Sequence, residues 1–390
     1  YSKEDLIING NGTLNVNAGY RNGIKSTDDC IIVSGTLNIT STEDGIIGKD
    51  LCGVVAGDIN INAGSDGIKS TYDTDTTKGN VIIEGGNITI KASNDGIQAE
   101  NILVINDGAI NIKTNNGAAD TTQTHIDNMD MGRGGFGFNN NKTTTTTDDT
   151  SESRKGIKAG NMLIINDGDI TIDSDDDSVH CNSVIYIYGG TINAATGDDG
   201  VHADDLLTVN GGTINITQCY EGIEADDIVI NDGDISVVSS DDGINSSDGS
   251  ITINGGNLLI NASGDGLDAN GSIIINGGYI VVLGPTSDGD TAIDYDDSCT
   301  INGGTVMAFG SSGMLEIPKG ASNGACIVTA FTSVSGGSKY TLSDSNGNEI
   351  LSYTPSKAYA AAIVYSDKIT TGNTYDITAG STTLSIEVTS

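Results

Sequence analysis

The chain has 390 residues, of which 53 are acidic and 17 basic, so its formal net charge is −36 at pH 7. A chain this acidic repels phosphate groups, which excludes nucleic acids and anionic membranes as unaided partners and implies that a cation is bound. Glycine is abundant at 54 residues, whereas proline numbers 3 and tryptophan is absent. This profile is typical of many short strands joined by tight turns.

A segment of about 22 residues recurs along most of positions 5 to 308, and Asp199 to Tyr220 is its clearest copy. A fixed period of this length indicates a solenoid, in which each repeat forms one turn, or rung, packed on its neighbours. One glycine marks the same turn in every copy and predicts about twelve rungs: Gly12, Gly35, Gly57, Gly86, Gly108, Gly168, Gly190, Gly212, Gly233, Gly256, Gly278 and Gly304.

Apolar residues alternate with polar ones on both sides of each turn glycine, as expected for strands with one buried face. After the glycine they occupy the second and fourth positions, as in Leu37 and Ile39, and a further strand precedes the glycine. A third short strand carries a recurrent D-G-I segment. Three strands per rung of this length predict an all-β chain that folds as a parallel β-helix, and the consensus of a leucine-rich repeat is missing.

The period divides the chain into a β-helix over residues 1–310 and a small C-terminal β domain over residues 311–390, which we expect to seal the open end of the solenoid. A long insertion at about residues 113–154 interrupts the repeat, and its Gly/Asn/Thr composition allows either a mobile flap or a disordered loop. Cys30 and Cys52 occupy core positions on adjacent rungs, where a free buried pair is favoured over a disulfide.

No apolar run approaches the roughly 18 residues that cross a bilayer. The sequence starts at Tyr1 inside a rung, so we expect that a leader has been removed and that the protein is extracellular or at the cell surface. The same start suggests an open stack of strand edges, which leads to the hypothesis that subunits assemble head to tail into a fibre.

The residue after the buried position of each D-G-I segment forms a column that we call the mixed ladder. It changes along the solenoid from basic through histidine to acidic: Lys25, Ile47, Lys69, Gln98, Lys158, His180, His202, Glu224, Asn245, Asp268 and Asp294. We expect Lys25, Lys69, Lys158, His180 and His202 to be the ligand-binding residues.

The residue that opens each D-G-I segment forms a second column, the acid ladder, and carboxylates repeated at about 4.8 Å repel one another. Hard oxygen ligands converging from neighbouring rungs suit Ca²⁺, although a solvated acidic face is the alternative. We therefore predict calcium ligands among Asp176, Asp177, Asp198, Asp199, Glu221, Glu224, Asp241, Asp242, Asp265, Asp268 and Asp294. No catalytic residue is predicted.

The repeated D-G-I and N-G-G-T-I-N-I motifs, the Gly/Arg/Phe insertion and the tail segment Thr354 to Tyr359 resemble the secreted clostridial-type β-helix proteins known as carbohydrate-binding-domain proteins. This resemblance implies a right-handed β-helix with bound calcium that binds cellulose or pectin, similar in fold to the family 9 pectate lyases. Those lyases use an Asp-Asp-x-x-Asp calcium cluster and a lysine base, which Asp198-Asp199 with His202 and Asp241-Asp242 with Asn245 match only in part.

Three hypotheses follow, and the first is favoured. It is a non-catalytic, calcium-dependent polysaccharide-binding protein. The second is a calcium-dependent pectate lyase, which needs a base beside the metal, and the candidate lysines Lys25, Lys69 and Lys158 are placed rungs away from the densest acids. The third is the subunit of a head-to-tail surface fibre.

Overall fold

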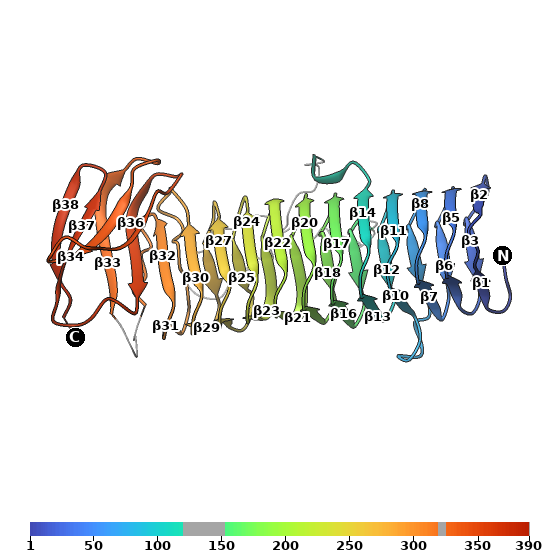
Figure 1. The fold of residues 1–390 in the computed structure, drawn as a ribbon, viewed down its shortest axis with the longest axis horizontal. Helices are drawn as coiled ribbons and strands as arrows, with labels where there is room; N and C mark the ends of the chain where they lie inside the picture. Colours follow the sequence, from blue (N-terminus) through green and yellow to red (C-terminus); the bar gives the residue numbers. More distant parts are fainter. Residues whose placement is uncertain (120–152, 319–324, 390) are drawn as a thin grey trace, which may run out of the picture.

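The computed structural model describes residues 1–119, 153–318 and 325–389. Its described residues form parallel strands stacked along one long axis, with a smaller antiparallel part at the C-terminal end (Figure 1). The predicted parallel β-solenoid of about twelve rungs is confirmed. The central part of the predicted insertion lies outside the described residues.

Two of the three strands in each rung belong to one 20-stranded parallel sheet. Its strands are β1 Leu6–Ile8, β3 Ile24–Ser26, β4 Cys30–Ile32, β6 Ile46–Gly48, β7 Leu51–Val54, β9 Ile68–Ser70, β10 Asn80–Ile83, β12 Ile97–Ala99, β13 Ile102–Ile105, β15 Ile157–Ala159, β16 Met162–Ile165, β18 Val179–Cys181, β19 Val184–Ile187, β21 Val201–Val209, β23 Ile223–Ile230, β25 Ile244–Ser246, β26 Ile251–Ile253, β28 Leu267–Ala269, β29 Ser272–Ile275 and β31 Ser298–Ile301.

The third strand of each rung belongs to a 14-stranded sheet on the other side of the core. It contains β2 Thr13–Ala18, β5 Thr36–Ser41, β8 Asp58–Ala63, β11 Asn87–Ala92, β14 Ala109–Thr114, β17 Asp169–Ser174, β20 Thr191–Thr196, β22 Thr213–Gln218, β24 Asp234–Val238, β27 Asn257–Asn261, β30 Tyr279–Leu283, β32 Thr305–Gly310, β36 Tyr359–Ser366 and β33 Cys326–Val334. A separate 4-stranded antiparallel sheet contains β35 Glu349–Tyr353, β34 Tyr340–Asp344, β37 Thr374–Ala379 and β38 Thr382–Glu387.

The alternating pattern of the sequence sets which side chains enter the core. In β8, for example, Ile59 and Ile61 are buried while the residues beside them face outward. Stacking in register places each isoleucine on the isoleucine of the next rung, as between β8 and β11. The only helical element among the described residues is the 3-10 turn Gly117–Ala119, and no described helix is long and apolar enough to span a membrane.

The turn glycine has a positive φ in eleven of the twelve predicted rungs, and in the first rung Gly10 takes that conformation instead of Gly12. At Gly57, with φ of 123°, an added Cβ would lie 2.7 Å from the carbonyl oxygen of Gly35 on the rung before. Both the backbone conformation and the close stacking therefore require glycine. The asparagines before these turns bond one another between rungs, as from Asn254 Nδ2 to Asn231 Oδ1 at 2.8 Å.

The C-terminal strands pack on the last rungs through two contacts. Strand β36 pairs antiparallel with β32, and Ile363 and Tyr365 of β36 join the solenoid core. A second core forms where Met307 and Phe309, on the outward side of β32, pack against residues of the C-terminal sheet. β32 is already paired with β36, so β33 is the edge strand at this end of the 14-stranded sheet. A fibre that continues the sheet from this end would have to pair with β33. Head-to-tail assembly stays a prediction.

Cys30 of β4 and Cys52 of β7 are in register, fully buried and not joined by a disulfide. They pack as small apolar side chains in the core, as expected for free thiols at an inward position.

Candidate functional site

The mixed ladder is in register through the whole solenoid. Lys158 of β15 pairs with His180 of β18, His180 pairs with His202 of β21, and His202 pairs with Glu224 of β23. The same register continues through Asn245 to Asp268. The predicted column from basic through histidine to acidic residues is therefore present, one residue per rung.

The acid ladder has a structural role that the sequence reading missed. In most rungs one carboxylate oxygen of the acid accepts the backbone N–H of the residue that opens the next rung, whereas Glu221 accepts from the side chain of Asn245. Examples are Asp66 Oδ1 with Asp95 at 3.0 Å, Asp177 Oδ1 with Asp199 at 3.1 Å, and Asp242 Oδ1 with Asp265 at 2.6 Å. Because hydrogen bonds to a carboxylate stabilise its charge, part of the expected repulsion is offset without a metal.

The second carboxylate oxygen faces the mixed-ladder residue three positions later in the chain. Asp66 Oδ2 lies 2.6 Å from Lys69 Nζ, and Asp199 Oδ2 lies 3.1 Å from Nδ1 of His202. In these rungs each acid therefore has a cationic or ionisable partner of its own. The charge of the predicted ligand residue Lys69 is used within the protein.

Lys155 is a lysine among the acids that the sequence reading overlooked, since it takes the place of aspartate in the acid ladder. Its Nζ lies 2.9 Å from Asp176 Oδ1 and 2.5 Å from Asp177 Oδ2, and its side chain is only 14% exposed. Although burial alone lowers the pKa of Lys155, the two carboxylates raise it above its usual range. From the sequence, only Lys25, Lys69 and Lys158 were candidate lysines, and this one beside the acids was missed.

His202 is held between two carboxylates, with Nδ1 at 3.1 Å from both Asp199 Oδ2 and Glu224 Oε2. Burial by itself lowers the pKa of His202, but the hydrogen bond to Asp199 and the charges of Asp177 and Glu224 raise it to about 10. In the metal-free protein at neutral pH, His202 is therefore a cation that partly neutralises this region.

Past His202 the ladders offer oxygen ligands alone. In the described part of the chain, no ion pair joins Glu221, Asp242, Asp265 or Asp268 to a basic side chain. Burial and the charges of neighbouring acids raise the pKa of Glu221 to about 9 and that of Asp242 to about 8. Burial is also the main cause that raises the pKa of Asp265 to about 7 and that of Asp268 to about 6.

The predicted metal ligands do not form a single site, because they extend over six successive rungs. The structure brings together Asp176, Asp177 and Asp198 in one group and Asp242, Asp265 and Asp268 in another, each with ligand atoms within 4.8 Å of one another. Asp199 and Glu224 group with His202, while Glu221, Asp241 and Asp294 lie in the rungs between or beside these groups. Lys25 and Lys69 lie on β3 and β9, outside all of them.

A third acidic group, Asp5, Asp28 and Asp29, lies in the first rungs and was missed by the sequence reading. Its signal in the sequence is the acidic pair after a D-G-I strand, a pattern that recurs at Asp226 and Asp227.

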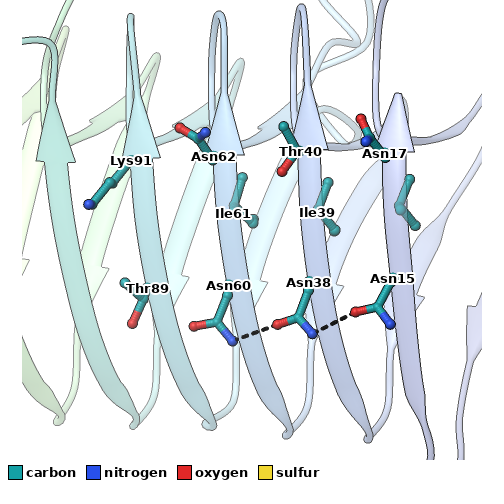
Figure 2. A pocket seen from close by; sticks show the side chains of 11 residues that line it. Asn15, Asn17, Asn38, Ile39, Thr40, Asn60, Ile61, Asn62, Thr89 and Lys91 are labelled. Atoms are coloured by element: carbon teal, nitrogen blue, oxygen red, sulfur yellow. Dashed lines mark hydrogen bonds between the residues drawn. The ribbon is translucent and has the colours of Figure 1, made fainter. Parts of the chain in front are cut away.

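A shallow groove of about 430 Å³ crosses the outward side of β2, β5, β8 and β11 (Figure 2). Asn15, Asn38 and Asn60 form one row along it, joined by Nδ2 to Oδ1 hydrogen bonds of 2.8 and 3.1 Å. Asn17, Thr40 and Asn62 form a second row. Ile39 and Ile61 lie between the rows with buried side chains, so they offer backbone to a ligand. We call this surface the Asn/Thr groove.

A family model described as a carbohydrate-binding domain-containing protein matches residues 1–200 and again residues 198–386. The chain belongs to this family. No curated protein and no solved structure matches the chain. Together the two matches cover the solenoid and nearly all of the C-terminal part, and the family description supports carbohydrate binding.

In this carbohydrate-binding chain, the side-chain contacts of Lys155 give less support to the resemblance to pectate lyases than the sequence did. A base beside the metal must be unprotonated to take a proton from the sugar. Lys155 contacts Asp176 and Asp177, and these two carboxylates favour its protonated form. The geometry of this region is that of an ion-pair network, not of a lysine base.

Proposed function

We propose that this chain is an extracellular, calcium-binding and non-catalytic protein that binds cell-wall polysaccharides such as pectin and cellulose. Membership of the carbohydrate-binding domain family supports the polysaccharide, and the oxygen-only rungs of the acid ladder support the calcium. The net charge of −36 links the two, since an acidic chain needs a cation to hold an acidic polysaccharide.

Asp242, Asp265 and Asp268 are the best candidates for the calcium ligands. They come from adjacent rungs, their oxygens lie within 4.8 Å of one another, and no basic side chain is paired with them in the described residues. In Asp242 and in Asp265, one carboxylate oxygen accepts a backbone N–H. Each of the three acids still has an oxygen that a metal ion could bind. Ca²⁺ takes 6 to 8 oxygens with flexible geometry, which leaves positions for water or for a carboxylate of the ligand.

Calcium would reverse the local sign of the surface and complete its shell with the carboxylates of a polyuronate. This bridging accounts for pectin as a partner. It does not apply to cellulose, which is uncharged and needs hydrogen-bonding groups instead.

The Asn/Thr groove supplies such groups, since its two rows of amides and hydroxyls repeat once per rung along the solenoid axis. The rung spacing of about 4.8 Å is comparable to the rise of one sugar in an extended β-linked glucan. A glucan lying along the groove could therefore meet equivalent polar groups at successive sugars. We place the neutral polysaccharide there.

Calorimetric titration of the full chain with polygalacturonate, in calcium and then in chelator, tests the proposal. Binding should require calcium and should weaken in Asp265→Asn, which keeps an oxygen for the amide of Thr291 but loses the charge. Equal binding in chelator would contradict the calcium bridge. Release of an unsaturated sugar product would instead establish the lyase, and secretion is checked by fractionating the native host.

A further inference from the structure

The two histidines of the mixed ladder face one another across adjacent rungs. His180 of β18 and His202 of β21 are register partners, their ring centroids are 4.9 Å apart and the rings are inclined by 62°. Their side chains are 12% and 25% exposed. The solenoid therefore fixes two imidazoles in a largely buried position at the point where the ladder changes from basic to acidic.

His180 carries the observation that points to a ligand. Its Nε2 lies 2.9 Å from Asn182 Oδ1, which can only accept, so Nε2 carries the proton. In the neutral ring the lone pair is then on Nδ1. That nitrogen is enclosed from solvent and makes no aligned hydrogen bond, although Asp177 Oδ2 lies only 2.8 Å away.

A lone pair placed against a carboxylate oxygen is repulsive unless a proton on Nδ1 or a metal ion lies between them. Lys155 contacts Asp177 Oδ2 from the other side, but it offsets one charge among Asp176, Asp177, Asp198, Asp199 and Glu224, which surround the histidines. His202 adds a second positive charge and burial raises the pKa of Asp198 to about 8, so a smaller excess of negative charge remains around the histidines.

We propose that Asp177, His180 and His202 bind a divalent transition-metal ion such as Zn²⁺. One ligand atom from each lies within 4.8 Å of the others. The 2.8 Å between His180 Nδ1 and Asp177 Oδ2 is close to the separation of about 3.0–3.4 Å between neighbouring ligands on a metal with bonds of about 2.1 Å.

The carboxylates beyond His202 fit the same assignment. Asp199 and Glu224 each lie 3.1 Å from its Nδ1, and such partners orient a ligating imidazole and raise its basicity. Imidazole ligands favour zinc, copper and nickel, whereas calcium prefers oxygen alone. The two ladders together would thus carry two kinds of metal position, nitrogen-containing at the histidines and oxygen-only from Asp242 to Asp268. The inference at the histidines holds whether or not calcium binds.

Calorimetric titration of the chelator-treated full chain with Zn²⁺, in a large excess of Ca²⁺, is the test. We expect one binding event that calcium does not displace, and a loss of affinity of at least about tenfold in both His180→Gln and His202→Gln. Asp265→Asn should leave zinc binding intact, which separates this site from the proposed calcium site. His125→Gln changes the third histidine, outside the described residues, and is the matched control.

Electron paramagnetic resonance with Cu²⁺ gives a second readout. The wild-type chain should show coupling to two imidazole nitrogens, and each of the two histidine variants to one. Circular dichroism of the metal-free variants checks that the solenoid is folded. Zinc affinity unchanged in both folded variants, full displacement by calcium, or copper without nitrogen coupling would each overturn the proposal.

Discussion

The ammonium of Lys155 is buried against the carboxylate of Asp177 on the next rung, with 2.5 Å between Nζ and Oδ2. Asp177 is only 2% exposed, so its charge relies on protein partners and not on solvent. Although burial raises the pKa of Asp177, Lys155 and the neighbouring histidines hold it well below its usual range. This pair neutralises the first of the densely acidic rungs.

Replacing Lys155 by methionine should therefore strongly destabilise the chain. Removing one partner of a buried ion pair leaves an uncompensated charge, which costs about 3–5 kcal/mol. Urea unfolding followed by far-UV circular dichroism measures the change. The matched control is Lys339→Met, which breaks an exposed pair with Glu349 and should cost less than about 1 kcal/mol. Equal losses in the two variants would contradict the buried pair.

Calcium should raise the melting temperature of the chain if the oxygen-only rungs bind it. An ion that binds only the folded state adds RT ln(1 + [Ca²⁺]/Kd), or about 2.7 kcal/mol at a hundredfold excess over Kd. Asp242→Asn and Asp265→Asn should remove most of this increase. Asp234→Asn is the control, because its carboxylate lies on the outward side of β24 and bonds Asn257. Melting curves unchanged by calcium would leave the acids as a solvated face.

The metal-free chain should lose stability as the pH rises from about 4 to about 9. The folded pKa values of Asp268, Asp265, Asp242 and Glu221 are raised to about 6, 7, 8 and 9, above unfolded values of roughly 4. Between these limits the folded state holds more protons than the unfolded state, so raising the pH favours unfolding.

Urea midpoints measured in chelator across this pH range check the prediction. Asp242→Asn should flatten the slope, because amides do not titrate. A midpoint that rises between pH 5 and pH 8 would contradict it. Below about pH 4 the trend reverses, because the unfolded chain then binds a proton that Asp177, with its lowered pKa, does not bind in the folded state.

Replacing Asn38 and Asn60 together by alanine should weaken cellulose binding by at least about fivefold, because two hydrogen bonds at about 0.5–1.5 kcal/mol each are lost. The control pair is Asn193 and Asn215, which bond each other on the same outward sheet face but outside the groove. Cellulose pull-down with quantified unbound protein measures both. Equal weakening in the two double variants would place the polysaccharide elsewhere.

The sequence was sufficient to predict the repeat, the inward side chains and both ladders. A constant period with alternating apolar residues fixes which residues stack, so the register of His180 on His202 follows once the rungs are counted. The C-terminal packing had a signal too, since Met307 and Phe309 break the rule that outward positions are polar.

What each ladder residue contacts was decided only by the tertiary structure. The amides that bond Asp177 and Asp242, the reach of Lys155 to the next rung and the buried Nδ1 of His180 depend on side-chain length and rotation between rungs. Periodicity carries no information on these, because it specifies the column in which a residue stands and not the direction in which its charged atoms point. The Asn/Thr groove could not be predicted for the same reason, because its outline is made by side chains of four successive strands.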